Sequence, residues 1–139
     1  MAELNLYLDA ALTTLATEPL VFQQDDQGVT APHQRQFYLG STDTGATFEA
    51  LTDPGVDQIV LSITDAAPGS GQEAASLKLA TTQAGLATAV AGADLDLGTS
   101  IAAGAAGAKE IWVQWDDTTA TQGTDLNLSI GLNEIKVTT

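Results

Sequence analysis

Apolar and polar residues alternate in short runs along most of the chain, a period of two that is typical of β-strands with one buried face. The apolar positions of these runs are Leu4, Leu6 and Leu8; Phe37 and Leu39; Ile59, Leu61 and Ile63; Leu77 and Leu79; Leu95 and Leu97; Ile111, Val113 and Trp115; Leu126, Leu128 and Ile130; and Ile135 and Val137. Clusters of Gly, Pro, Asp and Thr separate the runs, and these residues favour tight turns. The pattern predicts an all-β fold of eight or more strands, arranged as a sandwich or a barrel.

Two segments depart from this alternation. Leu8, Leu12 and Leu15 fall at helical spacing, and Asp9 stands where an N-cap belongs, so the spacing predicts a short helix. The two threonines that follow Leu12 weaken this prediction because β-branched side chains lose rotamer freedom in a helix. The stretch 81–93 is apolar but has few large side chains, and we interpret it as a small-residue loop or a weak edge segment.

Size and charge narrow the range of functions. A chain of 139 residues suits one domain with one core, and we expect an arm or short helix over residues 1–18 before a β-sandwich domain over residues 19–139. The 18 acidic residues outnumber the 4 basic ones and give a net charge of −14, which disfavours binding to nucleic acid. The N-terminus does not resemble a secretory signal and no run is apolar enough to span a bilayer, so we expect a soluble protein made in the cytoplasm, with no membrane partner.

Candidate catalytic and metal-binding groups are sparse. His33 is the single histidine and has no evident triad partners, so we interpret it as a polar surface residue. The acidic pairs at 25–26 and 116–117, with Asp94 and Asp96, could supply oxygen ligands to Ca²⁺, but exposed acidic turns account for them better. The chain also lacks cysteine and the Lys-Ser/Thr ending of a phosphate loop. We therefore predict no catalytic, cofactor-binding or metal-binding residues, and a protein that is not an enzyme.

The aromatic residues are more informative about binding. In the run that ends at Trp115, alternation places Trp115 on the apolar face and Trp112 on the opposite face, so we expect one tryptophan in the core and the other more exposed. An exposed Trp112 would either anchor a protein neighbour or stack on a sugar. The remaining alternative is that a loop or the N-terminal segment covers it. The candidates for interface contacts are Trp112, Tyr7, Tyr38, Phe48, Leu12 and Leu15.

The order of these features resembles a known group of proteins. A Pro-Leu-Val-Phe run at 19–22 leads to the segment 33–42, then to the strand pattern at 59–63, the Ala- and Gly-rich approach to the tryptophan strand at 101–115, and the closing run at 123–130. This order resembles the immunoglobulin-like antiparallel β-sandwiches that recur in tailed bacteriophages, as capsid decoration (cement) proteins and as tail, baseplate or fibre modules. The cysteine pair of antibody-type domains is absent.

The resemblance implies a non-enzymatic structural protein of the virus particle, assembled in the host cytoplasm. We expect a capsid decoration protein that stabilises the head through subunit contacts, with a tail, baseplate or fibre-attachment component as the first alternative and a carbohydrate-binding module as the second. The expected partners are the major capsid protein or tail proteins, together with further copies of the chain in a homo-oligomer. The N-terminal segment from Ala2 to Leu15 is the expected arm for reaching a neighbour.

Overall fold

The computed structural model describes residues 2–20, 33–116 and 126–139, and this part of the chain consists of short antiparallel strands without an α-helix. The strands are β1 (Asn5–Tyr7), β2 (His33–Gly40), β3 (Thr47–Ala50), β4 (Val60–Asp65), β5 (Leu77–Ala80), β6 (Leu95–Asp96), β7 (Ser100–Ala102), β8 (Lys109–Trp115), β9 (Leu128–Leu132) and β10 (Ile135–Thr138). Three short 3₁₀ turns join some of them, η1 (Ala74–Ser76), η2 (Ala84–Ala87) and η3 (Ala105–Gly107). The all-β class predicted from the alternation is confirmed.

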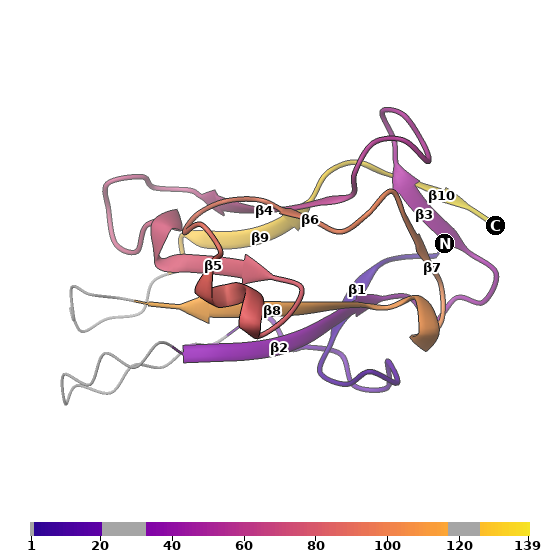
Figure 1. Cartoon of the computed structure of the whole chain (residues 1–139), viewed down its shortest axis with the longest axis horizontal. Helices are drawn as coiled ribbons and strands as arrows, with labels where there is room; N and C mark the ends of the chain where they lie inside the picture. Colours follow the sequence, from indigo (N-terminus) through magenta and orange to yellow (C-terminus); the bar gives the residue numbers. More distant parts are fainter. Residues whose placement is uncertain (1, 21–32, 117–125) are drawn as a thin grey trace.

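The strands form three antiparallel sheets (Figure 1). Sheet A has the order β1-β2-β8-β5, sheet B the order β10-β3-β7, and sheet C the order β6-β4-β9. In the view of Figure 1, sheet C lies above β5, β8 and β2 of sheet A, and sheet B lies toward one end of both. Paired backbone bonds between Ile59 and the segment 97–98, each 2.8 Å long, connect the loop before β4 to the loop before β7.

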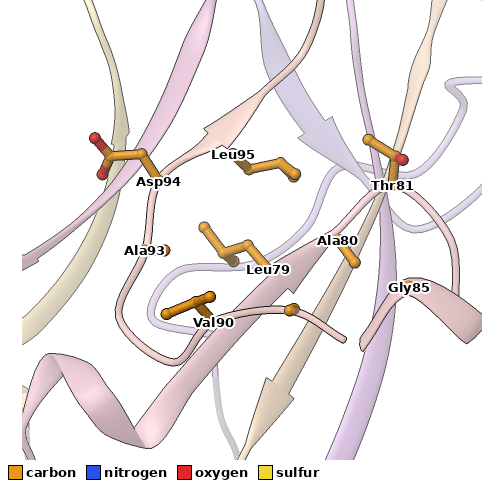
Figure 2. Close-up of a pocket in the computed structure, with 9 residues that line it drawn as sticks. Leu79, Ala80, Thr81, Gly85, Val90, Ala93, Asp94 and Leu95 are labelled. Carbon is orange, nitrogen blue, oxygen red and sulfur yellow. The ribbon is translucent and has the colours of Figure 1, made fainter. Parts of the chain in front are cut away.

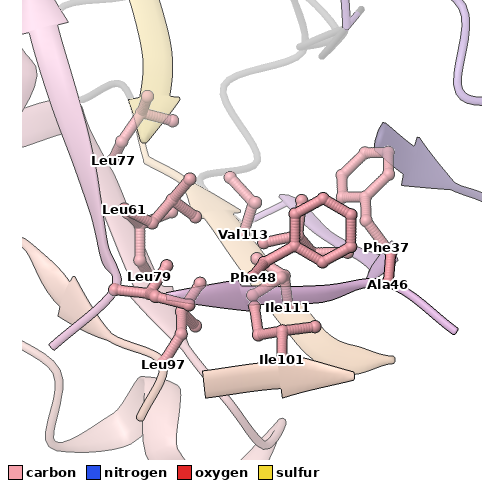
Figure 3. Close-up of a cluster of buried hydrophobic side chains, with 12 residues drawn as sticks. Phe37, Ala46, Phe48, Leu61, Leu77, Leu79, Leu97, Ile101, Ile111 and Val113 are labelled. Atoms are coloured by element: carbon pink, nitrogen blue, oxygen red, sulfur yellow. The ribbon is translucent and has the colours of Figure 1, made fainter. Parts of the chain in front are cut away.

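The core lies between the sheets and draws large side chains from each of them. Its buried members are Phe37, Leu39, Ala46, Phe48, Ile59, Leu61, Leu77, Leu79, Leu97, Ile101, Ile111 and Val113 (Figure 3). Apolar side chains on alternate strand positions point inward because successive residues of a strand face opposite sides of the sheet. The described part of the N-terminal segment also contributes, since Ala2, Leu4, Leu6 and Ala16 pack against this cluster.

Two strands were not predicted by the alternation. β3 and β7 each carry a single large apolar side chain, Phe48 and Ile101. Without a second large apolar residue two positions away, their sequences do not show the alternation that predicts a strand. They form because they pair with each other and, for β3, with β10, so that both apolar side chains are buried in the core. The stretch 81–93 is a loop with the short turn η2, in agreement with one of its two interpretations.

The predicted helix after Leu8 is wrong. This segment instead folds back along β1, where Leu8 N–H donates to the Thr14 carbonyl at 2.8 Å and Ala16 N–H donates to the Leu6 carbonyl at 2.9 Å. Leu12 has a φ of 58°, a left-handed conformation that no right-handed helix contains. The apolar spacing serves a different purpose, because the buried Leu12 side chain lies against Gly40 rather than along a helical stripe.

Among the described residues, no helix has the length and apolar character needed to cross a bilayer. The predicted strand at 19–22 lies partly outside the described residues.

Candidate interaction surface

The face of sheet A that points away from the core carries most of the polar and aromatic candidates. Phe37 and Ile111 fill the core side of β2 and β8, so alternation turns Gln36, Tyr38 and Trp112 to the other side. We call this side the outer face of sheet A and define it by Leu15, Gln34, Gln36, Tyr38, Glu110, Trp112 and Gln114. Strand register brings these residues together although 99 positions separate Leu15 from Gln114.

Two aromatic residues lie near the middle of the outer face. Tyr38 stands opposite Tyr7 on one side and Glu110 on the other, and Trp112 stands opposite Gln36. Trp112 is half-buried, with its indole N–H donating to the Glu110 carboxylate. The same carboxylate oxygen accepts a hydrogen bond from the Gln36 side chain at 2.7 Å. Glu110 therefore fixes the orientation of the indole ring and links it to the neighbouring strand.

A second set of hydrogen bonds continues this face toward η2. The Gln34 amide donates to Gln114 at 3.0 Å, and the Gln83 amide donates to Gln34 at 3.0 Å. Gln114 is buried, so its partnership with Gln34 satisfies a side chain that would be costly to leave unpaired. These hydrogen-bonded amides form the polar part of the outer face. The aromatic residues form its apolar part.

Trp115 takes the opposite side of β8, as predicted. It packs against the core cluster and stacks on His33, with ring centroids 5.9 Å apart and planes inclined by 30°. His33 therefore acts as a partner for a core-facing tryptophan. Both tryptophans are half-buried. The expected difference between them is therefore in the side of sheet A that each ring faces, more than in its exposed fraction.

The six interface candidates separate by burial. Phe48, Leu12 and Tyr7 are 1%, 4% and 6% exposed, so they are packed within the chain and offer almost no surface to a neighbour. Phe48 belongs to the core cluster, and the fold-back of residues 8–16 places Leu15 opposite Tyr7. Leu15 is 56% exposed and bridges Tyr7, while Tyr38 and Trp112 are half-buried. Leu15, Tyr38 and Trp112 are therefore the candidates with surface to offer.

A carboxylate holds the fold-back that presents Leu15. Asp9 accepts hydrogen bonds from the backbone N–H of Thr13 at 3.1 Å, from the Thr13 hydroxyl at 2.8 Å and from the backbone N–H of Thr14 at 2.7 Å. Desolvation of the carboxyl raises its pKa, but these bonds to the ionised form outweigh that effect and lower the pKa below its ordinary value of 3.8. The expected N-cap residue thus caps a tight turn.

The fold-back should consequently loosen in acid. Because the pKa of Asp9 is lowered in the folded state, the stabilisation by its carboxylate is complete at pH values above the ordinary pKa. This stabilisation is lost as the pH falls through the lowered pKa. We expect the amide resonances of Thr13 and Thr14 to titrate together below about pH 4, followed by NMR. In Asp9→Asn the same two resonances should occupy their acid positions at neutral pH. A wild-type spectrum that is flat across this range would contradict the role assigned to Asp9.

Two shallow hollows also lie on the described surface. The first, about 320 Å³, lies beside β5 and is lined mainly by Leu79, Val90 and Leu95, with small residues between them (Figure 2). Figure 2 shows the Asp94 carboxylate directed away from Leu79 and Val90, and Thr81 adds a hydroxyl group to the lining. The second, about 270 Å³, lies between the N-terminal residues and the strands β9 and β10, and its apolar lining includes Leu4, Leu132 and Val137.

No three acidic or histidine side chains converge on one point among the described residues. Of the acidic residues considered for Ca²⁺, the described ones, Asp94, Asp96 and Asp116, belong to no such group, whereas 25–26 and 117 lie outside the described residues. The arrangement of the outer face suits recognition through contact, because it combines the Trp112 ring, held by Glu110, with the hydrogen-bonded amides of Gln34, Gln83 and Gln114. Comparisons with protein-family models, with curated proteins and with solved structures find no match to this chain.

Proposed function

We propose that this chain is a non-enzymatic structural protein of a tailed-phage particle, built as an immunoglobulin-like β-sandwich, and that it acts as a capsid decoration protein. The observation that carries the proposal is the outer face of sheet A, where Leu15, Tyr38 and Trp112 lie on a hydrogen-bonded polar background. Tryptophan and tyrosine are enriched among the residues that contribute most to protein interfaces.

Docking through this face would work by shape and apolar contact. The Glu110 carboxylate fixes the Trp112 ring in the free protein, so little rotamer entropy is lost when a neighbour covers the ring. The polar amides around it can form the hydrated rim of such an interface. The charge of −14 keeps the remaining surface hydrated and disfavours contact with packaged DNA. In the proposed particle, the neighbour is the major capsid protein.

The copy number of the chain in purified particles tests this proposal. Quantitative mass spectrometry should find hundreds of copies if the protein decorates the capsid, whereas a handful would place it in the tail, baseplate or fibres. Complete absence from particles would overturn the virion role.

Replacing Trp112 tests the docking surface itself. In Trp112→Ala the chain should stay folded, because the ring lies outside the core cluster, and its occupancy on particles should fall by about tenfold or more, as expected for an interface hot spot. Val56→Ala, which changes an exposed side chain in the loop after β3, is the matched control and should leave occupancy unchanged. Equal occupancy of both variants would remove Trp112 from the interface.

Carbohydrate binding is the second candidate function, and the surroundings of Trp112 support it. Aromatic rings beside amide and carboxylate groups can stack on a sugar and bond its hydroxyls, and Gln36 and Glu110 flank the Trp112 ring. Binding to an array of neutral glycans that disappears in Trp112→Ala, together with absence from particles, would favour this function over decoration.

A further inference from the structure

The strand β9 has an open edge that differs from the other strand edges of the described chain. Within the described residues, β4 is its only strand neighbour (Figure 1). The edge of β1 is bridged by Leu15, and Gly92 N–H donates to the outer carbonyl of Leu77 in β5 at 2.8 Å. β6 and β7 have two and three residues, and β10 carries Lys136 within its four. Short length, covering loops and lysine are the usual protections of an edge, and within residues 2–20, 33–116 and 126–139 none of them is found at β9.

Register shows which backbone groups this edge presents. Ala66 N–H donates to the Asn127 carbonyl at 2.9 Å, and Asn133 N–H donates to the Val60 carbonyl at 3.1 Å. Hydrogen-bonded pairs alternate along an antiparallel ladder, so Ser129 and Gly131 also bond toward β4. The N–H and C=O groups of Leu128, Ile130 and Leu132 therefore point away from β4.

The sequence of β9 and its flanks is symmetric about Ile130. It reads Asn-Leu-Ser-Ile-Gly-Leu-Asn from 127 to 133. The residues two positions before and after Ile130 are both leucine, and those three positions away are both asparagine. Its immediate neighbours, Ser129 and Gly131, are both small. A second copy related by a twofold axis at Ile130 would place Leu128 opposite Leu132, Ser129 opposite Gly131, and Ile130 opposite itself. In this register the backbone N–H and C=O groups of Leu128, Ile130 and Leu132, which point away from β4, meet the same groups of the second copy. These residues therefore form the hydrogen-bonded pairs of the new ladder.

From this symmetry we infer that β9 pairs antiparallel with β9 of a second copy of this chain, through a twofold axis at Ile130, and joins the two C sheets into one. The symmetry of this run favours a second copy over another protein. The run from Leu126 to Asn133 also carries no charge in a chain of net charge −14, so no like charges face each other along the paired strands. The half-buried side chains of Leu128, Ile130 and Leu132 extend the core across the junction, and only Ser129 and Gly131 meet on the other side.

The inference is independent of the proposed place in a virus particle, and it is tested on the purified full chain. Sedimentation velocity from micromolar to millimolar concentration should show the mass rising from 14.3 kDa toward about twice that value. A mass that stays at 14.3 kDa throughout, or one that settles on a trimer, would overturn the inference.

A pair of charge variants locates the interface on β9. In Ser129→Glu/Gly131→Glu, each glutamate would face another across the twofold axis, and the dimer dissociation constant should rise by about tenfold. Both positions are exposed, and a side chain at Gly131 enters open space without a left-handed backbone. In Ser129→Lys/Gly131→Glu, unlike charges face each other, and dimerisation should be restored.

The matched control moves the same two charges one strand away from the edge. Ser62 and Thr64 are the β4 partners of Gly131 and Ser129, so Ser62→Glu/Thr64→Glu adds equal charge on the same side of sheet C. We expect this control to dimerise more tightly than the β9 glutamate variant, with circular dichroism confirming that all variants are folded. Equal weakening by both would show a general charge effect and reject the β9 interface.

Discussion

Phe48→Ala should lower the free energy of unfolding by about 3–5 kcal/mol. Phe48 is 1% exposed and extends from the central strand of sheet B into the core, where Figure 3 shows it beside Ile101 and Ile111. Truncation removes the apolar ring and leaves a cavity that the surrounding strands can fill only in part. The loss is large against the total stability of a small domain, about 5–15 kcal/mol. Urea unfolding followed by fluorescence of the two tryptophans measures it.

The control for Phe48 lies just beyond the same strand. Leu51 follows β3 and is 49% exposed, so Leu51→Ala should change the unfolding free energy by less than about 0.5 kcal/mol. If Phe48→Ala kept its stability but lost occupancy on particles, Phe48 would be an interface residue after all, and the burial of its ring in sheet B would need another explanation.

Gly107→Ala is the second substitution expected to have a large effect, about 3 kcal/mol. Gly107 ends η3, where the chain turns from β7 in sheet B to β8 in sheet A. A Cβ atom on Gly107 would lie 2.7 Å from the carbonyl carbon of Ala102 and closer still to its oxygen. Backbone atoms cannot move aside as a flexible side chain can, so the methyl group would force the two strands apart. Thermal and urea unfolding would both report the loss.

A glycine without such a neighbour provides the comparison. Gly131 lies in β9, where a methyl group would have no atom within 4 Å and the backbone is not left-handed, so Gly131→Ala should be neutral or slightly stabilising. Equal losses for both glycines would mean that backbone entropy, and not the contact with Ala102, makes Gly107 necessary.

The roles of Phe48 and Gly107 differ in how far the sequence alone predicts them. Phe48 is recognisable there as an aromatic residue of uncertain role, because the four residues of β3 do not alternate strongly enough to mark a buried face. Gly107 carries no signal beyond an Ala- and Gly-rich context, since the atom it must avoid belongs to Ala102, five positions earlier at the end of β7.

The candidate surface was also predictable only in part, because alternation shows which face a residue takes but not which residues it meets there. Alternation along β8 assigned Trp112 and Trp115 to opposite faces, and the structure confirms that assignment. It could not give the partners of Trp112, because Gln36 reaches Glu110 across 74 positions through the register of β2 and β8. Nor could it separate Leu15 from Leu12, which differ in exposure only because the chain folds back along β1.

The sequence by itself determined the secondary structure class, the inward faces of most strands and the acidic character of the surface. These follow from local alternation, turn residues and charge, none of which depends on distant parts of the chain. The tertiary structure decided the turn held by Asp9 in place of a helix, the burial of Phe48, the close approach at Gly107 and the open edge of β9. Each of these depends on which strands lie side by side, and strand pairing is set by the packing of residues that are far apart in the chain.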